Sequence, residues 1–287
     1  MSPSASTAAG PARPPRSAFP FIGWFVFLAA LAASWRIAEV RPLELLLGEG
    51  RDKLFSFVKE MFPPDLSAEF LGFTLRPAIE TLQISILGTA LAVVIGFPLS
   101  LLAASNLSFT GVLHEAEVEG RPALRALRSI PYVLARSALN VFRAVPEFVW
   151  ALIFVRAVGL GPFPGVLAIG VGYGGVLGKV FAEIFEEVSP QPLEALQATG
   201  ASRLSTFFYG FLPQALPNLA SYALYRWECA IRAAAILGFV GAGGIGQQIE
   251  VSMRMFKQQE TLTLILILLV MVTAVDRASA WIRKQIL

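Results

Sequence analysis

Charged residues are scarce in this chain of 287 residues. They make up 15% of the sequence, against 55% hydrophobic residues, whereas an average soluble domain carries roughly 25% charged residues. The composition therefore indicates an integral membrane protein. Five or six helical spans of about 20 residues each would use nearly half of the length, which leaves little room for a separate catalytic domain. We expect one all-α membrane domain with short loops.

Cysteine, histidine and strong net charge are also lacking. The single cysteine, Cys229, excludes a disulfide within the chain. The single histidine, His114, lies in a polar segment, and no cluster resembles a metal site. A net charge of +3 is too small to suggest a nucleic-acid partner. A nucleotide-binding loop is missing too, because GYGGVLGKV has Tyr173 where the first loop glycine must stand and Val180 after Lys179.

The first 76 residues differ in composition from the rest of the chain. Residues 1–18 are rich in Ser, Ala and Pro and are predicted to be a disordered cytoplasmic tail. Segment 19–76 opens with an apolar run, Phe19–Ala38, which we interpret as a first span. A cleaved signal peptide is the alternative, but several more spans follow. The remainder of this segment is expected to be an external amphipathic stretch on the membrane surface, and residues 77–287 the core transmembrane domain.

Five further spans are expected in the core domain. One of them carries Gly170, Gly174 and Gly178 at every fourth position, a ridge that lets helix backbones approach closely. Six spans place both termini on one side of the membrane, and a modest excess of Arg and Lys there favours the cytoplasm. The five expected spans are about Ala78–Ala104, Ala144–Leu160, Gly165–Phe185, Asn218–Val240 and Leu262–Ala280.

Charged residues interrupt two of these spans. Pro146 should kink its helix beside Glu147, and Arg143, one turn earlier, is the expected partner of that carboxylate. A role in gating or assembly and plain ion pairing both remain open. In a later span, Glu228 and Arg232 are four residues apart and are expected to neutralise each other.

Arg226 points to nearly the opposite side of that later helix from Glu228. It must therefore find a partner on another helix or face an aqueous path, so a pathway role and a structural ion-pair network are both possible. The sequence GAGGIG comes next, at residues 241–246, and matches the dinucleotide fingerprint, but an apolar helix precedes it instead of a strand. We interpret it as a flexible re-entrant turn or span-end cap, followed by a loop.

A polar, helix-prone stretch, PQPLEALQATGASRLSTFFYGFLP at residues 190–213, interrupts the apolar sequence. Ser189 with two prolines predicts a helix start, Gly200 should end or bend the helix, and Pro213 should stop any helix beyond it. Such a short helix suits a groove in a separate cytoplasmic protein, and an ordinary surface helix is the alternative. On this helix, Glu194, Ala195, Ala198 and Ala201 are expected to form an exposed surface of small residues.

This stretch resembles the EAA loop of ABC-importer permeases. The resemblance rests on Glu194-Ala195, on Gly200 six positions after Glu194, and on Leu212-Pro213. It implies that the loop is the coupling helix that fits into the ATP-binding subunit, through Glu194, Ala195, Ala198, Gly200 and Ala201. Two positions depart from the family pattern: Leu196 replaces the second alanine, and Gly210 stands where a branched apolar residue is common.

The resemblance extends from about Thr81 to the C-terminus. ALNVFRAVPEF, GVLGKVFAEIFEEV and RWECAIRAAAILGFVGAGGIG are similar to the phosphonate ABC-transporter permease. That family implies the type I ABC importer permease fold in a bacterial inner membrane and the import of phosphonate, phosphate, phosphite or hypophosphite. It also implies a permease homodimer, a periplasmic binding protein, and two ATPase subunits that hold ATP and Mg. This chain itself is then not an enzyme and carries no cofactor.

Such an importer would work by alternating access, and its anionic cargo needs positive charge or oriented N–H groups along its path. Arg226, and with less support the paired Arg232, could supply the charge. Gly241, Gly243 and Gly244 could supply the N–H groups. Two other classes remain: an ion-coupled secondary transporter that uses the intramembrane charges as a relay, and a membrane scaffold that transports nothing.

Overall fold

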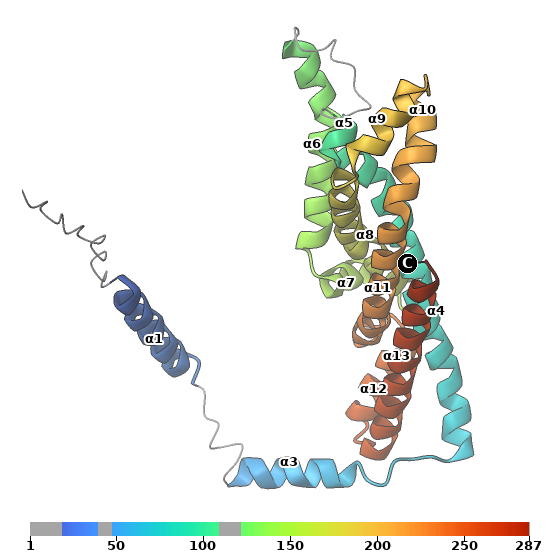
Figure 1. Ribbon diagram of the computed structural model, residues 1–287. Helices are drawn as coiled ribbons and strands as arrows, with labels where there is room; N and C mark the ends of the chain where they lie inside the picture. The colour runs from blue at the N-terminus through green and yellow to red at the C-terminus, as the bar shows by residue number, and fades with distance from the viewer. Residues whose placement is uncertain (1–18, 40–47, 109–121, 287) are drawn as a thin grey trace, which may run out of the picture. The chain divides into compact units, whose positions relative to one another are not determined.

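The computed structural model describes residues 19–39, 48–108 and 122–286, and over these residues the chain is helical without any strand (Figure 1). The predicted tail, residues 1–18, and His114 lie outside the described residues. The chain divides into two compact units, residues 1–58 and 59–287.

The first unit contains α1 (Phe19–Ile37) and most of α3 (Glu49–Glu60). The sequence predicts a helix for the apolar run, and α1 confirms that over 19 residues. In α3, Glu49 lies in the first turn and Lys59 in the last, which is the charge arrangement that the helix dipole favours. Large apolar side chains of α3, such as Leu54 and Phe55, are exposed. Its position on a membrane surface stays a prediction.

The second unit opens with α4 (Ala68–Ala103), which is 36 residues long. This helix starts ten residues before the predicted Ala78, because Ser67 provides an N-cap whose Oγ accepts a hydrogen bond from the Phe70 N–H at 3.3 Å. Pro77 lies inside the helix without ending it. After α4, the chain makes the short helix α5 (Ser105–Ser108).

The predicted kink at Pro146 is confirmed. Helix α6 (Pro122–Ala144) ends just before it, α7 (Glu147–Val158) begins just after it, and the two are bent by 90°. The span expected at about residues 144–160 therefore does not begin as one helix at Ala144, since α6 ends there and α7 starts beyond the bend. The 12 residues of α7 reach only about 18 Å, short of the roughly 30 Å of hydrocarbon that a span must cross.

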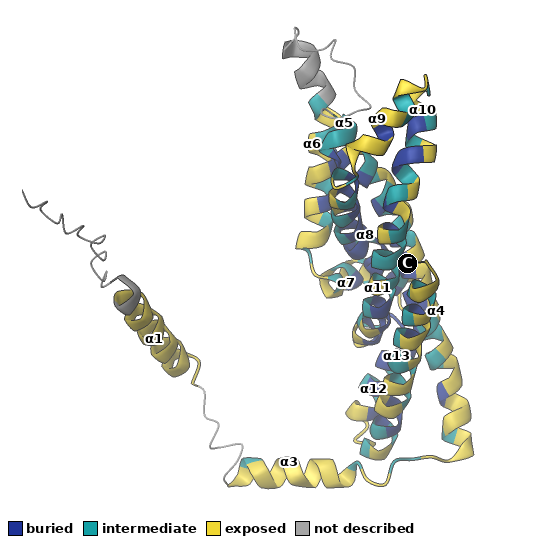
Figure 2. Ribbon diagram, viewed as in Figure 1, coloured by how far each residue is buried: buried dark blue, intermediate teal, exposed yellow. Residues whose placement is uncertain are grey.

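Helix α8 (Pro162–Glu186) is the central element of the second unit, and its dark-blue turns in Figure 2 mark it as the most continuously buried helix. The glycine ridge explains its close packing, as predicted. A Cβ added to Gly96 of α4 would lie 2.8 Å from the Gly174 carbonyl oxygen and 2.9 Å from the Gly178 nitrogen. The backbones of α4 and α8 therefore touch, and only glycine fits at this crossing.

The chain then forms the elements that carry most of the predicted site residues. Helices α9 and α10 lie at one end of the bundle in Figure 1, and the connection from α12 to α13 lies at the other. The loop predicted at residues 249–260 is wrong except at residues 255–257, because α12 extends to Arg254 and α13 begins at Gln258. The elements are α9 (Pro190–Ala198), α10 (Arg203–Thr206), the π-helix η2 (Phe207–Phe211), α11 (Leu212–Gly238), α12 (Gly244–Arg254) and α13 (Gln258–Ile286).

The all-α membrane class is confirmed, while the count of six spans stays a prediction. Among the described residues, α4, α8 and α13 are long and apolar enough to cross a membrane, and the bent α6–α7 pair would make a fourth. Helix α11 has 27 residues, about 40 Å by its rise, so it is long enough to span. It carries Arg226, Glu228 and Arg232 and is not among the helices that are apolar enough to cross a membrane.

Candidate functional site

The coupling loop predicted from the sequence is a separate nine-residue helix, α9, whose outer face is exposed. Ser189 stands at the N-cap with Pro190 in the first turn, so the predicted start is confirmed. Gly200 has φ +84° and ends the helix, as predicted. Exposed to solvent on α9 and just after it are Glu194, Ala195, Ala198 and Gly200.

Two details of that prediction are wrong. Ala201 lies beyond the end of α9 and is half-buried, so it does not continue the small exposed face. Pro213 does not stop a helix; it lies in the first turn of α11, directly after the π-helix η2. The chain from α10 through η2 into α11 is therefore one continuous helical path.

Leu193 and Leu196 attach α9 to that path. Leu193 is 3% exposed, and a Cβ added to Gly210 of η2 would lie 2.9 Å from a methyl carbon of each leucine. Below this contact, Phe211 packs on Phe207 with ring centroids 5.6 Å apart, and also on Phe185 of α8 at 5.6 Å. A displacement of α9 would therefore act on the first turn of α11 through direct side-chain contacts.

Further along α11, Arg226 is held between two aromatic rings. Its guanidinium carbon lies 5.3 Å from the ring centroid of Tyr173 on α8 and 5.5 Å from that of Tyr222. Its Nε and Nη2 donate to the Tyr222 hydroxyl at 3.1 and 3.0 Å. Among the described residues no carboxylate pairs with Arg226. A half-buried cation without a counter-ion is free to attract an anion.

The expected pair of Glu228 with Arg232 is wrong. Each of them contacts α13 instead: Arg283 Nη2 lies 2.6 Å from Glu228 Oε1, and Arg232 Nη1 lies 3.7 Å from Asp276 Oδ1. Helix α13 runs beside α11 and offers partners closer than the next turn of the same helix. Both groups therefore belong to a network between helices, which favours the structural alternative for Glu228 and Arg232.

Arg283 and Asp276 are residues that the sequence reasoning did not single out. Asp276 sits in the last expected span, at the end of its apolar run and directly before Arg277. An ionisable residue at such a place marks a functional or paired site by default. That rule, applied to the last span as it was to the earlier one, would have identified the α13 side of the network.

The predicted turn is confirmed at residues 241–243, whereas residues 244–246 already form the first turn of α12, and several N–H groups of this segment have partners. Gly241, Gly243 and Gly244 have φ values of +89°, +80° and +73°, which only glycine adopts without strain. The Gly244 N–H donates to Glu80 Oε2 at 3.3 Å, and the Ile245 N–H donates to Thr81 Oγ1 at 2.8 Å. The Gly241 N–H donates to the Gly238 carbonyl oxygen at 2.9 Å. The suggested role in holding an anion is therefore weakened for Gly241 and Gly244, whose N–H groups already have acceptors.

The expected pair of Arg143 with Glu147 is also wrong. Arg143 Nε donates to Asn140 Oδ1 at 3.1 Å. Glu147 begins α7, which turns by 90° at Pro146 and carries the carboxylate away from α6. The spacing rule for pairs within one helix does not apply across a break. Glu147 instead lies against Gly172 of α8, with its Cγ 3.1 Å from the place of a Cβ there.

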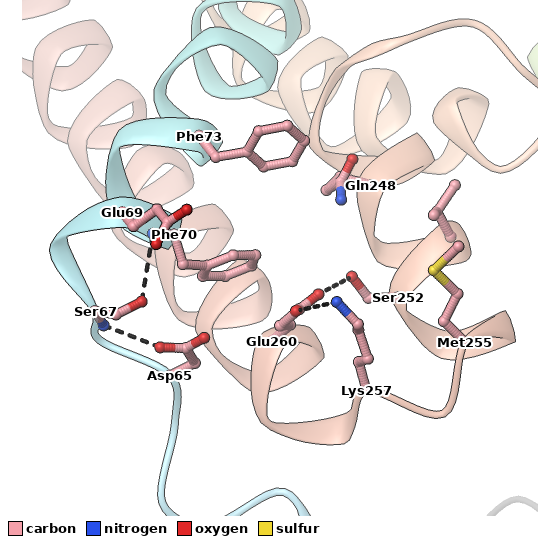
Figure 3. A pocket seen from close by; sticks show the side chains of 11 residues that line it. Asp65, Ser67, Glu69, Phe70, Phe73, Gln248, Ser252, Met255, Lys257 and Glu260 are labelled. Atoms are coloured by element: carbon pink, nitrogen blue, oxygen red, sulfur yellow. Dashed lines mark hydrogen bonds and ion pairs between the residues drawn. The ribbon is translucent and has the colours of Figure 1, made fainter.

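A pocket of about 440 Å³ opens at the other end of the second unit, between the starts of α4 and α13 and the end of α12 (Figure 3). Glu260 accepts from Lys257 Nζ at 2.7 Å and from Ser252 Oγ at 3.1 Å. Asp65 accepts from the Ser67 N–H at 3.0 Å, and the hydrogen bonds from Ser67 lower the pKa of that carboxyl. Three carboxylates line the pocket against one lysine, so it repels anions.

Comparison with known proteins adds to this geometry. Residues 122–287 match the family described as binding-protein-dependent transport system inner membrane component. A phosphite transport system permease protein, HtxC, of Stutzerimonas stutzeri is 40% identical over 91% of this chain and 85% of its own. The phosphite transport system permease protein PtxC of the same species is 37% identical over 92% of this chain and 91% of its own.

A solved structure shows the same fold. It is described as inward facing conformations of the MetNI methionine ABC transporter, and one of its chains superposes with a TM-score of 0.62 at 22% identity. The superposition covers 77% of this chain and 100% of that one. The expected type I importer permease fold is thereby confirmed. With the family match over more than half of its length, the chain belongs to the inner membrane components of binding-protein-dependent transport systems.

Proposed function

We propose that this chain is the membrane permease of an ATP-driven importer of phosphorus oxyanions. The observation that carries the proposal is the contact between α9 and the helical path behind it: the exposed short helix α9 rests on Gly210 of η2, and η2 continues without a helix break into α11, which carries Arg226. A partner that grips the exposed face of α9 can therefore move the helix that carries the candidate cargo-binding cation.

The cargo class is suggested by the relatives, whose names describe phosphite transport. Phosphite, phosphate and phosphonates share a tetrahedral phosphorus with charged oxygens, which bind well to a guanidinium. Arg226 is such a group, set in half-buried surroundings where its attraction for an anion is screened less than in water. The pathway proposal for the arginine on α11 is accordingly kept for Arg226 and dropped for Arg232.

The remaining partners follow from this assignment. A cytoplasmic ATPase dimer, which holds ATP and Mg, would grip Glu194, Ala195, Ala198 and Gly200, and both termini of the chain would lie on the same cytoplasmic side as α9. A second copy of the chain, or a related permease chain, would complete the membrane part. A periplasmic binding protein would deliver the oxyanion at the opposite end. ATP-driven closure would then alternate the access of the bundle.

Reversing the charge at Glu194 tests the proposal. Because Glu194 is exposed on α9, Glu194→Lys should leave membrane insertion and unfolding temperature unchanged, while ATP-dependent phosphite uptake into proteoliposomes falls at least roughly tenfold, the loss expected for one charge-assisted contact. Glu187→Lys, an exposed glutamate outside α9, is the matched control. Normal uptake by Glu194→Lys would refute the coupling role.

A second arm separates the energy sources. Uptake that continues without ATP and collapses with the ion gradient would replace this proposal with an ion-coupled secondary transporter. Copurification with an ATPase, and stimulation of that ATPase by phosphite, would support the ATP-driven importer. No flux of any oxyanion in the assembled complex would leave a scaffold that transports nothing.

A further inference from the structure

A groove with positive lining lies between α6 and α8, apart from Arg226. Its volume is about 270 Å³. On α6 the lining residues recur at spacings of three and four, so they share one helix face, and on α8 they do the same. We call it the basic groove and define it by Ala103, Arg136, Leu139, Asn140, Arg143, Lys179, Ala182 and Glu183.

Glycines of α8 fix the depth of the basic groove. A Cβ added to Gly175 would lie 2.7 Å from the Arg143 nitrogen and 2.9 Å from the Leu139 carbonyl oxygen, and one added to Gly178 would overlap the Leu139 side chain. The backbones of α6 and α8 are therefore in contact. The charged side chains project from two helices that cannot slide apart without losing this packing.

The lining of the groove is electropositive. Arg136, Arg143 and Lys179 face it together with one carboxylate, Glu183. Glu186 pairs with Arg136 from outside the lining, so three positive charges against two negative ones leave a formal charge of +1 at the groove. Glu183 pairs with Lys179 at 3.1 Å, and both side chains are about half exposed. An exposed pair of this kind contributes little and exchanges partners readily, so Lys179 is available to a stronger anion.

Two arginines of the groove are oriented by fixed contacts that leave donors free. Arg143 uses only its Nε, toward Asn140. Arg136 donates from Nε to the Ala103 carbonyl oxygen at 3.0 Å and from Nη2 to Glu186 Oε1 at 2.7 Å. Among the described residues, both Nη groups of Arg143 and the Nη1 group of Arg136 have no partner. These are planar donors of the type that binds two oxygens of one phosphorus centre.

We propose that the basic groove binds a small phosphorus oxyanion through Arg143 and Lys179, with Arg136 as a fixed charge at its rim. Pockets for drug-sized ligands usually measure roughly 300–1,000 Å³, so a groove of about 270 Å³ suits a smaller anion. The acidic pocket of Figure 3, at the other end of the unit, has the opposite charge and cannot substitute for it.

Two sources can supply this anion. One is cargo that is on its way to the cytoplasm, an assignment that rests on the proposed function. The other is the phosphate of an anionic lipid headgroup, since basic pockets between membrane helices on the cytoplasmic side bind such groups. The chemistry at Arg143 and Lys179 is the same in both cases, and the test has one arm for each source.

The test uses the full-length chain in nanodiscs of phosphatidylcholine. Phosphite, methylphosphonate and inorganic phosphate are titrated by isothermal calorimetry in the first arm. In the second arm, native mass spectrometry counts phosphatidylglycerol molecules retained by the chain from mixed nanodiscs. Arg143→Gln and Lys179→Gln should each weaken binding about tenfold or more in one arm, the usual effect of removing one charge-assisted contact. Arg156→Gln, an exposed arginine of α7 outside the groove, is the matched control.

A loss confined to the first arm identifies cargo, and a loss confined to the second identifies a lipid headgroup. Unchanged binding in both arms overturns the proposal, as does an equal loss in Arg156→Gln, which would report bulk charge only. If Arg143→Gln does not fold, Lys179→Gln decides alone, because the Lys179 side chain is 45% exposed. No ATPase is present, so a failure of the coupling role at α9 cannot produce or hide any of these outcomes.

Discussion

Leu196 occupies the space that Gly210 leaves open: its Cδ1 lies 2.9 Å from the position that a Cβ on Gly210 would take. These are the two positions at which the chain departs from the EAA-loop pattern. A larger residue on α9 is matched by a smaller one on η2, so the two departures compensate and α9 keeps its contact with η2.

A side chain at position 210 should displace α9 from its contact with η2. Gly210→Val would push against methyl carbons of both Leu193 and Leu196 at 2.9 Å, and overpacking of this kind costs typically about 1–3 kcal/mol. We expect faster tryptic cleavage after Arg203 and weaker ATP-dependent uptake, with little change in membrane insertion. The double variant Leu196→Ala/Gly210→Val should recover part of both, because the smaller residue restores the space. Equal behaviour of the single and double variants would show that the two positions are not coupled.

The ion pair between Glu228 and Arg283 should contribute more to stability than the pair between Arg232 and Asp276. The Glu228 side chain is 12% exposed, so Arg283→Gln leaves a desolvated charge without its partner, at a cost of up to about 3 kcal/mol. Arg232 and Asp276 are 49% and 43% exposed and 3.7 Å apart, so Arg232→Gln should cost less than about 1 kcal/mol. The unfolding temperatures of Arg283→Gln and Arg232→Gln in detergent measure this difference.

A double variant checks the cause of that effect. In Glu228→Gln/Arg283→Gln no charge is left buried, so the unfolding temperature should rise above that of Arg283→Gln alone. A further fall would mean that Arg283 stabilises α11 by packing and not by charge.

The crossing of α11 and α12 should be intolerant of a single methyl group. A Cβ added to Gly246 would overlap the Ala235 carbonyl oxygen, and one added to Gly238 would lie 2.7 Å from the Gly246 Cα. Backbone cannot rotate aside as a side chain can, so Gly246→Ala should cost about 3 kcal/mol or more. Gly72→Ala, where nothing lies within 4 Å, should be neutral or slightly stabilising. Thermal unfolding of Gly246→Ala and Gly72→Ala measures this difference in stability. Similar unfolding temperatures would contradict the backbone contact between α11 and α12.

Features that depend on neighbours in sequence were predictable. The prolines after Ser189 and the position of Gly200 give the start and end of α9, and the period of four in Gly170, Gly174 and Gly178 gives the buried face of α8. In each case the physical cause acts within one or two helical turns: a missing N–H, a positive φ, or a stripe without side chains.

Features that depend on distant elements were not predictable. The spacing rule paired Glu228 with Arg232 because it considers one helix, while Arg283 lies 55 positions away and competes only once α13 packs beside α11. The 90° bend at Pro146 likewise removed Glu147 from the reach of Arg143. A proline predicts that a helix breaks, but packing against α8 sets the angle of the break.

Variants of Arg226 can distinguish a role in the substrate path from a purely structural role. Arg226→Gln removes the only charge between Tyr173 and Tyr222 within the described residues, and phosphite uptake should fall at least about tenfold if that charge meets the cargo. Arg226→Lys keeps the charge but loses the fork of donors, so it should retain part of the uptake. Tyr222→Phe removes both hydrogen bonds to the arginine and keeps the ring below it, so its uptake should exceed that of Arg226→Gln. If Arg226 has only a structural role, the order is reversed. Tyr222→Phe should then lower the unfolding temperature, and its uptake should fall below that of Arg226→Gln. Initial rates against phosphite concentration, measured beside the unfolding temperature of each variant, decide between the two.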